Sequence, residues 1–241
     1  MPTSPARSSE PATDTPRRVT KRRGQTRQRL LDAAVEVFAE NGFGRSTVEQ
    51  ICERGGYTRG AFYSNFASLD EMFFAMWEQR SSAMLAHIRQ AADSSSIDLS
   101  GLSPAEKLRA GTALVLDVVP VDDQWYRINA EFTAHALRNP SLKKALAARE
   151  HTILDTIVPI LETALHRLGR RIDGDPRVLG RALVALHDGT SVQCLIEDEN
   201  AAARELRVEL FTRVVAAYTE PTPPTPTPTH TGKRGPRDRT G

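Results

Sequence analysis

The sequence predicts an all-α protein with nine helices in two domains, and three observations lead to this fold class. From about residue 25 to residue 219 the apolar residues recur at intervals of three and four, as on one face of a helix, and do not alternate as in a strand. Capping residues and Gly, Asn or Pro breaks divide this stretch into segments of helical length. The composition, 39% hydrophobic and 26% charged, is typical of a soluble globular protein.

Three helices are expected in the first domain. Leu30, Leu31 and Phe38 lie on one stripe of the first helix, and Asn41-Gly42 supplies the left-handed residue that ends it. Two short helices follow on either side of a turn at Gly55-Gly56, and each begins at a threonine whose hydroxyl can cap the helix. The expected ranges are Thr26–Glu40, Thr47–Arg54 and Thr58–Phe66.

Six longer helices are expected in the second domain, separated by breaks at Ser94 to Ser96, Pro120, Asn139-Pro140, Gly169 to Gly174 and Glu197 to Asn200. The first of them begins at Ser68 or Asp70 and runs to about Ala91. The others are expected at Pro104–Val119, Asp122–Leu137, Ser141–Leu168, Pro176–Glu197 and Ala201–Tyr218.

Both ends of the chain are expected to be disordered. Residues 1–24 have almost no apolar side chains to bury, and residues 220–241 repeat proline at nearly every second position. Seven Lys and Arg residues and no acid fall within residues 17–29. This basic arm suits a polyanion such as nucleic acid, although a solubilising tail has the same composition.

Two short helices joined by a glycine-containing turn and preceded by a longer helix form the pattern of a helix-turn-helix. The run from Thr26 to Phe73 closely resembles the amino-terminal region of the tetracycline-repressor (TetR) family of bacterial regulators. The matching residues are Thr26, Arg27, Leu31, Ala33, Ala34, Phe38, Gly42, Thr47, Val48, Ile51, Gly56, Gly60, Tyr63 and Phe66. The resemblance implies a DNA-binding domain over residues 25–68 and a ligand-binding and dimerisation domain over residues 69–219.

The third helix is expected to lie in the major groove of DNA, with its outer face toward the bases. On that face, Arg59 can pair with guanine or a phosphate, Asn65 with adenine or a phosphate, and Tyr63 with a phosphate. Two departures from the family pattern are Leu69 in place of a lysine and Asn65 in place of a histidine. The predicted DNA-binding residues are Arg23, Arg27, Thr47, Thr58, Arg59, Tyr63, Ser64 and Asn65.

The resemblance also implies that the last two helices pair with those of a second copy in a four-helix bundle, giving a homodimer. Both helices are apolar around much of their circumference, and their predicted interface residues are Leu186, Leu206, Leu210 and Val214. A small-molecule inducer, largely apolar, is expected in the body. Its predicted contacts are Trp125, Asn129, Phe132, His135, His151, Asp155, His187, Thr190 and Cys194.

Several classes of protein fit the sequence poorly. No stretch approaches the roughly 18 apolar residues of a membrane helix, and the polar amino terminus is unlike a signal peptide, so a cytoplasmic protein without membrane contact is expected. Cys52 and Cys194 form no CxxC pattern, and no metal or cofactor motif is present. No cofactor is therefore predicted.

An enzyme is the less favoured alternative. The chain lacks HExxH, GxGxxG, P-loop and GxSxG motifs, and the nearest candidates, His187-Asp188 and the SxxK of Ser141 to Lys144, are short enough to occur by chance. A constitutive DNA-binding or architectural protein without a ligand is a second alternative. The main prediction is a transcriptional regulator, a repressor released from a near-palindromic DNA operator by a small molecule.

Overall fold

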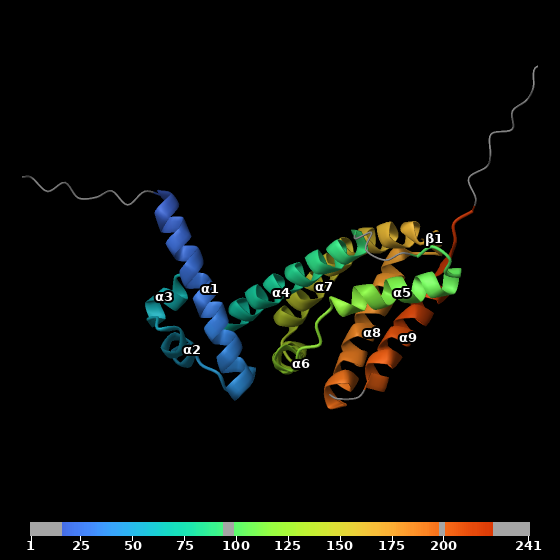
Figure 1. Cartoon of the computed structure of the whole chain (residues 1–241). Coiled ribbons are helices and arrows are strands. Elements are labelled where there is room, and N and C mark those ends of the chain that lie inside the picture. Colours follow the sequence, from blue (N-terminus) through green and yellow to red (C-terminus); the bar gives the residue numbers. More distant parts are fainter. Residues whose placement is uncertain (1–15, 94–98, 198–200, 224–241) are drawn as a thin grey trace, which may run out of the picture.

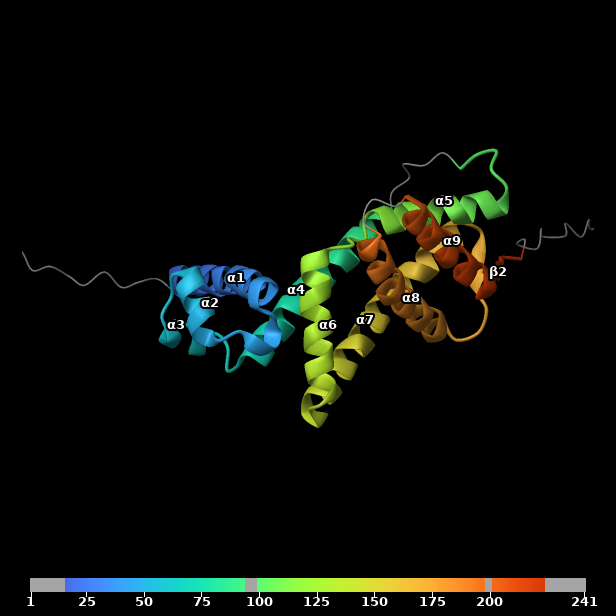
Figure 2. The same cartoon turned by 90° about the horizontal axis from the view of Figure 1, so that it is seen from below.

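The structure, a computed structural model, describes residues 16–93, 99–197 and 201–223 of the 241-residue chain. Within these ranges it is an elongated molecule of nine α-helices (Figure 1). Helices α1 to α3 form one end, and α5, α8 and α9 form the other. The long helix α4 runs from the first end into the second, and this arrangement is equally clear in the orthogonal view (Figure 2).

The small end is built on three capped helices. Thr47 begins α2 with a reciprocal cap, because its hydroxyl accepts from the Gln50 backbone N–H at 3.3 Å and the Gln50 side chain accepts from the Thr47 N–H at 2.9 Å. Gly56, at φ 71°, ends α2 in the left-handed conformation that favours glycine. The elements are α1 (Pro16–Asn41), the 3₁₀ turn η1 (Phe43–Arg45), α2 (Val48–Gly55) and α3 (Arg59–Tyr63).

The body contains the six longer helices near their expected positions, with Ser103, Asp122, Asn139 and Asp175 capping four of them. Two short strands pair in antiparallel register, Ile172 with Thr219 and Arg170 with Pro221. The elements are α4 (Leu69–Asp93), α5 (Pro104–Asp117), α6 (Asp123–Leu137), α7 (Pro140–Arg167), β1 (Arg170–Ile172), α8 (Pro176–Ile196), α9 (Ala201–Ala217) and β2 (Thr219–Pro221).

Three sequence-based expectations are corrected. Helix α1 begins at Pro16, so residues 16–24 of the expected disordered arm are helical; residues 1–15 lie outside the described residues. The third helix ends at Tyr63, and Phe66 follows it. The strand β2 includes residues 220 and 221 of the expected disordered tail, whose residues 224–241 are likewise not described. A three-residue strand is too short for an alternating pattern to stand out.

A single apolar core joins the small end to the body. Phe132 of α6 stacks on Phe73 of α4 with ring centroids 3.6 Å apart and an interplanar angle of 10°, and both side chains are fully buried. Phe43 of η1 meets the edge of the Phe132 ring at 5.0 Å. The same cluster includes Leu30, Phe38 and Phe62 of α1 and α3. The expected boundary at residue 68 therefore does not separate two cores.

The far end of the body has its own core. Leu179 and Leu183 of α8 pack with Phe211 and Val215 of α9, and Leu108 of α5 closes the cluster. Gly180 of α8 lies where a Cβ atom would approach the Leu154 side chain of α7 to 3.0 Å, so α7 and α8 are in close contact there. Helices α8 and α9 lie side by side in both views (Figures 1 and 2).

Truncating the stacked ring should destabilise the whole molecule. We expect Phe132→Ala to lower the free energy of unfolding by about 3–5 kcal/mol, since it removes a fully buried aromatic side chain and leaves a cavity. Leu137→Ala, on the same helix but 60% exposed, should change it by no more than about 0.5 kcal/mol. Urea unfolding of the two variants measures both values, and a similar small loss in each would show that the stack is unimportant.

Candidate nucleic-acid interface and helical body

Helix α3 is anchored by one face and exposes the other. The Thr58 hydroxyl accepts from the Ala61 N–H at 3.2 Å and caps the helix, while Phe62 and Phe66 are buried against α1 and α4. The opposite face presents Tyr63, which is 51% exposed, and Arg59. The two threonine caps and the outward position of Arg59 and Tyr63 agree with the sequence-based expectation.

Arg59 is held in place by two neighbours. Its guanidinium lies 3.0 Å from the Glu49 carboxylate of α2, with both side chains more than half exposed. The Tyr63 hydroxyl accepts a hydrogen bond from Arg59, and this bond, followed by the charge of Glu49, raises the pKa of Arg59 above its ordinary value. Glu49 was not singled out from the sequence. It lies in the first turn of α2 and Arg59 is the first residue of α3, so their ion pair joins the amino-terminal ends of the two helices.

The expected outward position of Asn65 was wrong. Its amide donates to the Ala61 carbonyl at 2.8 Å and to the Ser64 hydroxyl at 3.2 Å, and its Oδ1 atom is enclosed without a hydrogen-bond partner among the described residues. The reason is the early end of α3 at Tyr63. Asn65 lies beyond the helix and folds back onto its last turn, while the Ser64 side chain stays exposed.

Two basic residues of α1 lie beside the end of α3. Arg23 donates to the Ser64 carbonyl at 3.0 Å, and the Arg27 guanidinium lies 5.1 Å from the centre of the Phe66 ring. Both side chains remain exposed on their outer side. The basic residues nearest α3 therefore extend its cationic surface from a helix.

Three predicted ligand contacts lie at the junction of α6 with the small end. Phe132 is part of the shared core, Trp125 packs near Phe73 with the Arg80 guanidinium 4.9 Å over its ring, and His135 Nε2 lies 3.3 Å from an Asp70 carboxylate oxygen. Phe132 therefore belongs to the core and not to a pocket lining, whereas Trp125, which is half-buried, and His135, with 45% of its side chain exposed, stay predictions as ligand contacts.

Glu131 of α6 was not singled out from the sequence, yet it connects the body to the small end. Its carboxylate accepts from the Phe43 N–H at 2.7 Å, next to Gly42, where a Cβ atom would approach the same carboxylate to 2.6 Å. Gly42 has φ 79°, so both its backbone and its surroundings require glycine. Helix α6 thus contacts the corner between α1 and α2 directly.

Three other predicted contacts do not converge on a pocket. His151 lies 3.2 Å from Arg181, and Asp155 forms an ion pair with Arg177, both on the exposed surface where α7 meets α8. Asn129 is half-buried on α6. These assignments are corrected, because the spacing of polar residues along a helix does not show which neighbouring helix covers them.

The last three predicted contacts lie on α8, and two of them, His187 and Cys194, face α9. Thr190 donates to the Leu186 carbonyl at 2.7 Å, and His187 Nδ1 lies 3.0 Å from Arg207 of α9. Cys194 is buried beside them and hydrogen-bonds to Arg207. Burial, followed by the charge of Arg207, lowers the pKa of His187 to about 4, so the imidazole is neutral at pH 7.

A groove of about 810 Å³ lies between α4 and α7. Trp77, Leu85 and Ile153 supply its apolar lining, and Arg89 and Arg149 lie along it. None of the predicted ligand contacts lines this groove. A stripe of residues from Trp77 to Asp93 at helical spacing was the signal in the sequence that could have indicated it.

The predicted interface residues lie on α8 and α9 with different exposure. Leu206 is 47% exposed, and Leu186, Leu210 and Val214 are half-buried, with Leu186 and Val214 packed on the second core. Val178 and Ile196 of α8 are further large apolar side chains that face solvent, Ile196 being 77% exposed. Sequence reasoning missed their exposure.

Two features are absent from the part of the chain that the structure describes. No group of three or more His, Cys, Asp or Glu side chains is arranged to hold a metal ion there, and none of the described helices is long and apolar enough to span a membrane.

Two family models match the chain and together cover more than half of it. The first, for bacterial regulatory proteins of the tetR family, matches residues 30–76, and the second, for the C-terminal part of BetI-type transcriptional repressors, matches residues 104–220. Together with the exposed helix-turn-helix, these matches define a DNA-binding transcriptional regulator. The chain belongs to the TetR family.

Individual relatives agree with this assignment. The HTH-type transcriptional regulator UidR of Escherichia coli K12 is 25% identical over 176 residues, which cover 72% of this chain and 83% of UidR. The structure of Salmonella enterica GusR is similar at a TM-score of 0.59 and 24% identity, covering 80% of this chain and 96% of GusR. The multidrug binding protein EbrR, solved in complex with imidazole, is 26% identical at a TM-score of 0.54, covering 79% and 89% of the two chains.

The buried imidazole should make stability depend on pH. The unfolded chain takes up a proton at His187 near pH 6.5, whereas the folded protein does so only near pH 4, so stability falls as the pH drops between these values. We expect this residue to account for a loss of about 2–4 kcal/mol between pH 7 and pH 4. Urea unfolding at both pH values should show that loss reduced in His187→Gln, and an unchanged pH dependence would contradict the burial of a neutral imidazole.

Proposed function

We propose that this regulator binds its operator through the exposed face of α3 and acts as a homodimeric repressor that a small molecule releases from DNA. The observation that carries the proposal is the pairing of Arg59 and Tyr63 on that face, beside the basic residues of α1. Such a protein works where the chromosomal DNA lies, in the cytoplasm, without membrane contact.

In this proposal α3 enters the major groove and Arg59 reads a base. An arginine can donate two hydrogen bonds to guanine, whereas a tyrosine hydroxyl beside it is suited to a phosphate. Glu49 pairs with the Arg59 guanidinium in the free protein, in an exposed ion pair that a DNA base or phosphate would replace. Arg23, Arg27 and Ser64 add contacts to the DNA phosphates near the end of α3. Thr47 and Thr58 cap two helices whose amino-terminal N–H groups would also face phosphates.

A dimer would be formed through α8 and α9. The exposed apolar side chains Val178, Ile196 and Leu206 lie on these two helices, and burying them against a second copy would remove them from water. A two-fold dimer can present two α3 helices roughly 34–36 Å apart, one helical turn of DNA, which matches a near-palindromic operator.

Release by a ligand requires a connection between the body and the DNA-binding end. Helices α4 and α6 supply it, because Phe73, Phe132 and Glu131 join them to α1 and η1. The complex of the related EbrR with imidazole supports a ligand-responsive body, and His187, Thr190 and Cys194 are among the remaining candidate contacts. A ligand that lowers operator affinity must bind more weakly when the operator is present, by the same factor.

Loss of Arg59 should reduce sequence preference as well as affinity. With an operator obtained by mapping bound sites on the genome, Arg59→Ala should weaken binding by about 1–3 kcal/mol and bring it closer to binding of unrelated DNA. Tyr63→Phe should weaken both kinds of duplex alike. Fluorescence anisotropy measures these affinities, with Arg138→Ala, directly after α6, as a control for the loss of one charge. An equal loss for Arg59→Ala on both duplexes would mean that Arg59 reads no base.

Charge in the proposed interface should separate the subunits. Leu206→Glu and Leu210→Glu should sediment as folded monomers that bind the operator weakly, because a carboxylate would be buried against the partner. Leu137→Glu, exposed on α6, should leave the dimer intact. Analytical ultracentrifugation at micromolar concentration tests this, and a monomeric wild-type protein that binds its operator tightly would refute the dimer.

A further inference from the structure

The side chain of Arg207 is a buried cation between α8 and α9. Only 4% of the residue is exposed. Its guanidinium donates to the Ser191 hydroxyl at 3.2 Å, lies 3.0 Å from His187 Nδ1, and hydrogen-bonds to Cys194. None of these partners is a carboxylate. The ring of Phe211, centred 5.8 Å from the guanidinium, closes the site on its apolar side.

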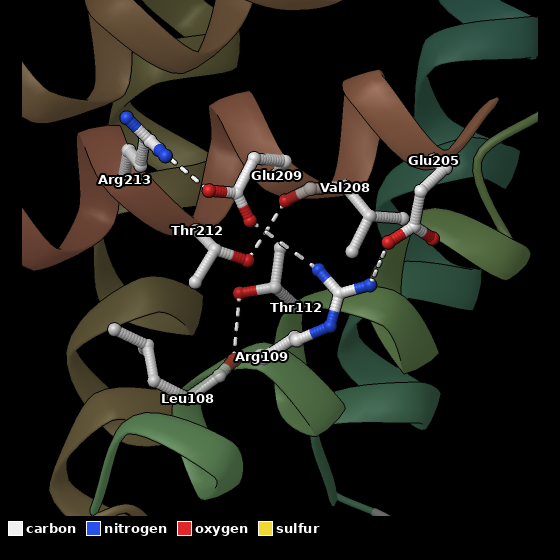
Figure 3. A network of polar contacts seen from close by, with 8 residues as sticks. All are labelled: Leu108, Arg109, Thr112, Glu205, Val208, Glu209, Thr212 and Arg213. Atoms are coloured by element: carbon white, nitrogen blue, oxygen red, sulfur yellow. Dashed lines mark hydrogen bonds and ion pairs between the residues drawn. The ribbon is translucent and has the colours of Figure 1, made fainter. Parts of the chain in front are cut away.

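The acidic residues nearest Arg207 in the sequence face another way. Glu205 and Glu209 lie on the α5 side of α9, where both pair with Arg109 and where Glu209 also accepts from Arg213 at 2.5 Å (Figure 3). Their charges are therefore already balanced by other arginines. Among the described residues no acidic side chain forms an ion pair with Arg207.

An unbalanced cation in this position is costly. Burial lowers the pKa of Arg207 because the charged form loses its hydration, and the charge of and hydrogen bond to Cys194 offset this only in part. A buried charge without a counter-charge destabilises a fold far more than a balanced pair does. The Nε–H group of Arg207 is also enclosed without a hydrogen-bond partner among the described residues. The site thus has positive charge and an unused donor, and no carboxylate among the described residues faces it.

The neighbouring groups are suited to the same missing ligand. His187 is neutral at pH 7 and accepts from Arg207 with Nδ1, so it adds no negative charge to balance the guanidinium. The Ser191 hydroxyl accepts from Arg207 and keeps its own hydrogen for donation. His187, Ser191 and Cys194 follow one another at helical spacing on the α9 side of α8, so the three groups belong to one helix face.

We propose that Arg207 anchors the carboxylate of a small molecule bound between α8 and α9, with Ser191 as a further donor and with an apolar remainder beside Phe211. The planar edge of a guanidinium matches the two oxygens of a carboxylate. This inference rests on the proposed ligand-responsive function and adds to it the chemical class of the ligand, an apolar molecule with one acidic group.

Thermal unfolding of the full chain tests the site with benzoate as the probe and benzamide as its uncharged counterpart. Benzoate should raise the Tm of the wild-type protein and benzamide should not. Arg207→Met should remove the benzoate effect, and Ser191→Ala should weaken benzoate binding about ten- to hundredfold. Thr212→Val on α9 is the matched control, because the Thr212 hydroxyl is already bonded to the Val208 carbonyl on the α5 side of the helix (Figure 3), and it should leave the benzoate effect unchanged.

The Tm without ligand gives an independent result. Arg207→Met should melt at or above the temperature of the wild-type protein, since it removes an unbalanced charge and keeps the side-chain volume. A much lower Tm would reveal a counter-charge that already balances Arg207 and would overturn the proposal. The proposal would also fail if benzoate left the wild-type Tm unchanged or raised that of Arg207→Met equally.

Operator binding separates this inference from the proposed function. If benzoate binds through Arg207 and the operator affinity stays the same, the carboxylate site is supported and release through it is excluded. If benzoate does not bind and the wild-type protein still binds its operator, the carboxylate site is overturned and the DNA-binding regulator remains.

Discussion

The stacking of Phe132 on Phe73 is the contact on which the arrangement of the two ends depends. It places α6 against α4 inside a core that also contains residues of α1, η1 and α3. Interiors are closely packed, so a shift of α6 cannot be absorbed within this core and must move its neighbours. The DNA-binding end is therefore mechanically connected to the body through two helices, α4 and α6.

The charges of the small end are arranged so that those near α3 remain available. Arg54 of α2 forms ion pairs with Glu36 and Glu40 of α1, at 2.9 and 2.6 Å, so its charge is balanced within the domain. Arg59 has a single carboxylate neighbour, Glu49, in an exposed pair that water and salt screen readily. A DNA phosphate or base can replace Glu49 at small cost in free energy, whereas the ion pairs of Arg54 hold α2 against α1.

Much of the fold could be predicted from local signals. Threonine caps before α2 and α3, the left-handed Gly56 and the apolar stripe of α1 act within one or two turns of the chain, so their effects are visible in the sequence. Arg59 and Tyr63 could be placed on an outer face because the buried Phe62 and Phe66 fix the orientation of their helix. Asn65 was misplaced, since the end of a five-residue helix depends on contacts with α1 that no local pattern encodes.

The sequence by itself determined the helices, the helix-turn-helix and the outward face of α3, because these follow from spacing and capping along a continuous stretch of chain. Only the tertiary structure decided which helix covers which face. Phe132 has the spacing of a pocket lining, yet Phe73 of α4 and Phe43 of η1 cover it, while Arg207 looks like a surface residue and is buried against α8. Helical periodicity shows that the apolar face of a helix is buried. Which other helix buries it depends on packing between residues far apart in the chain.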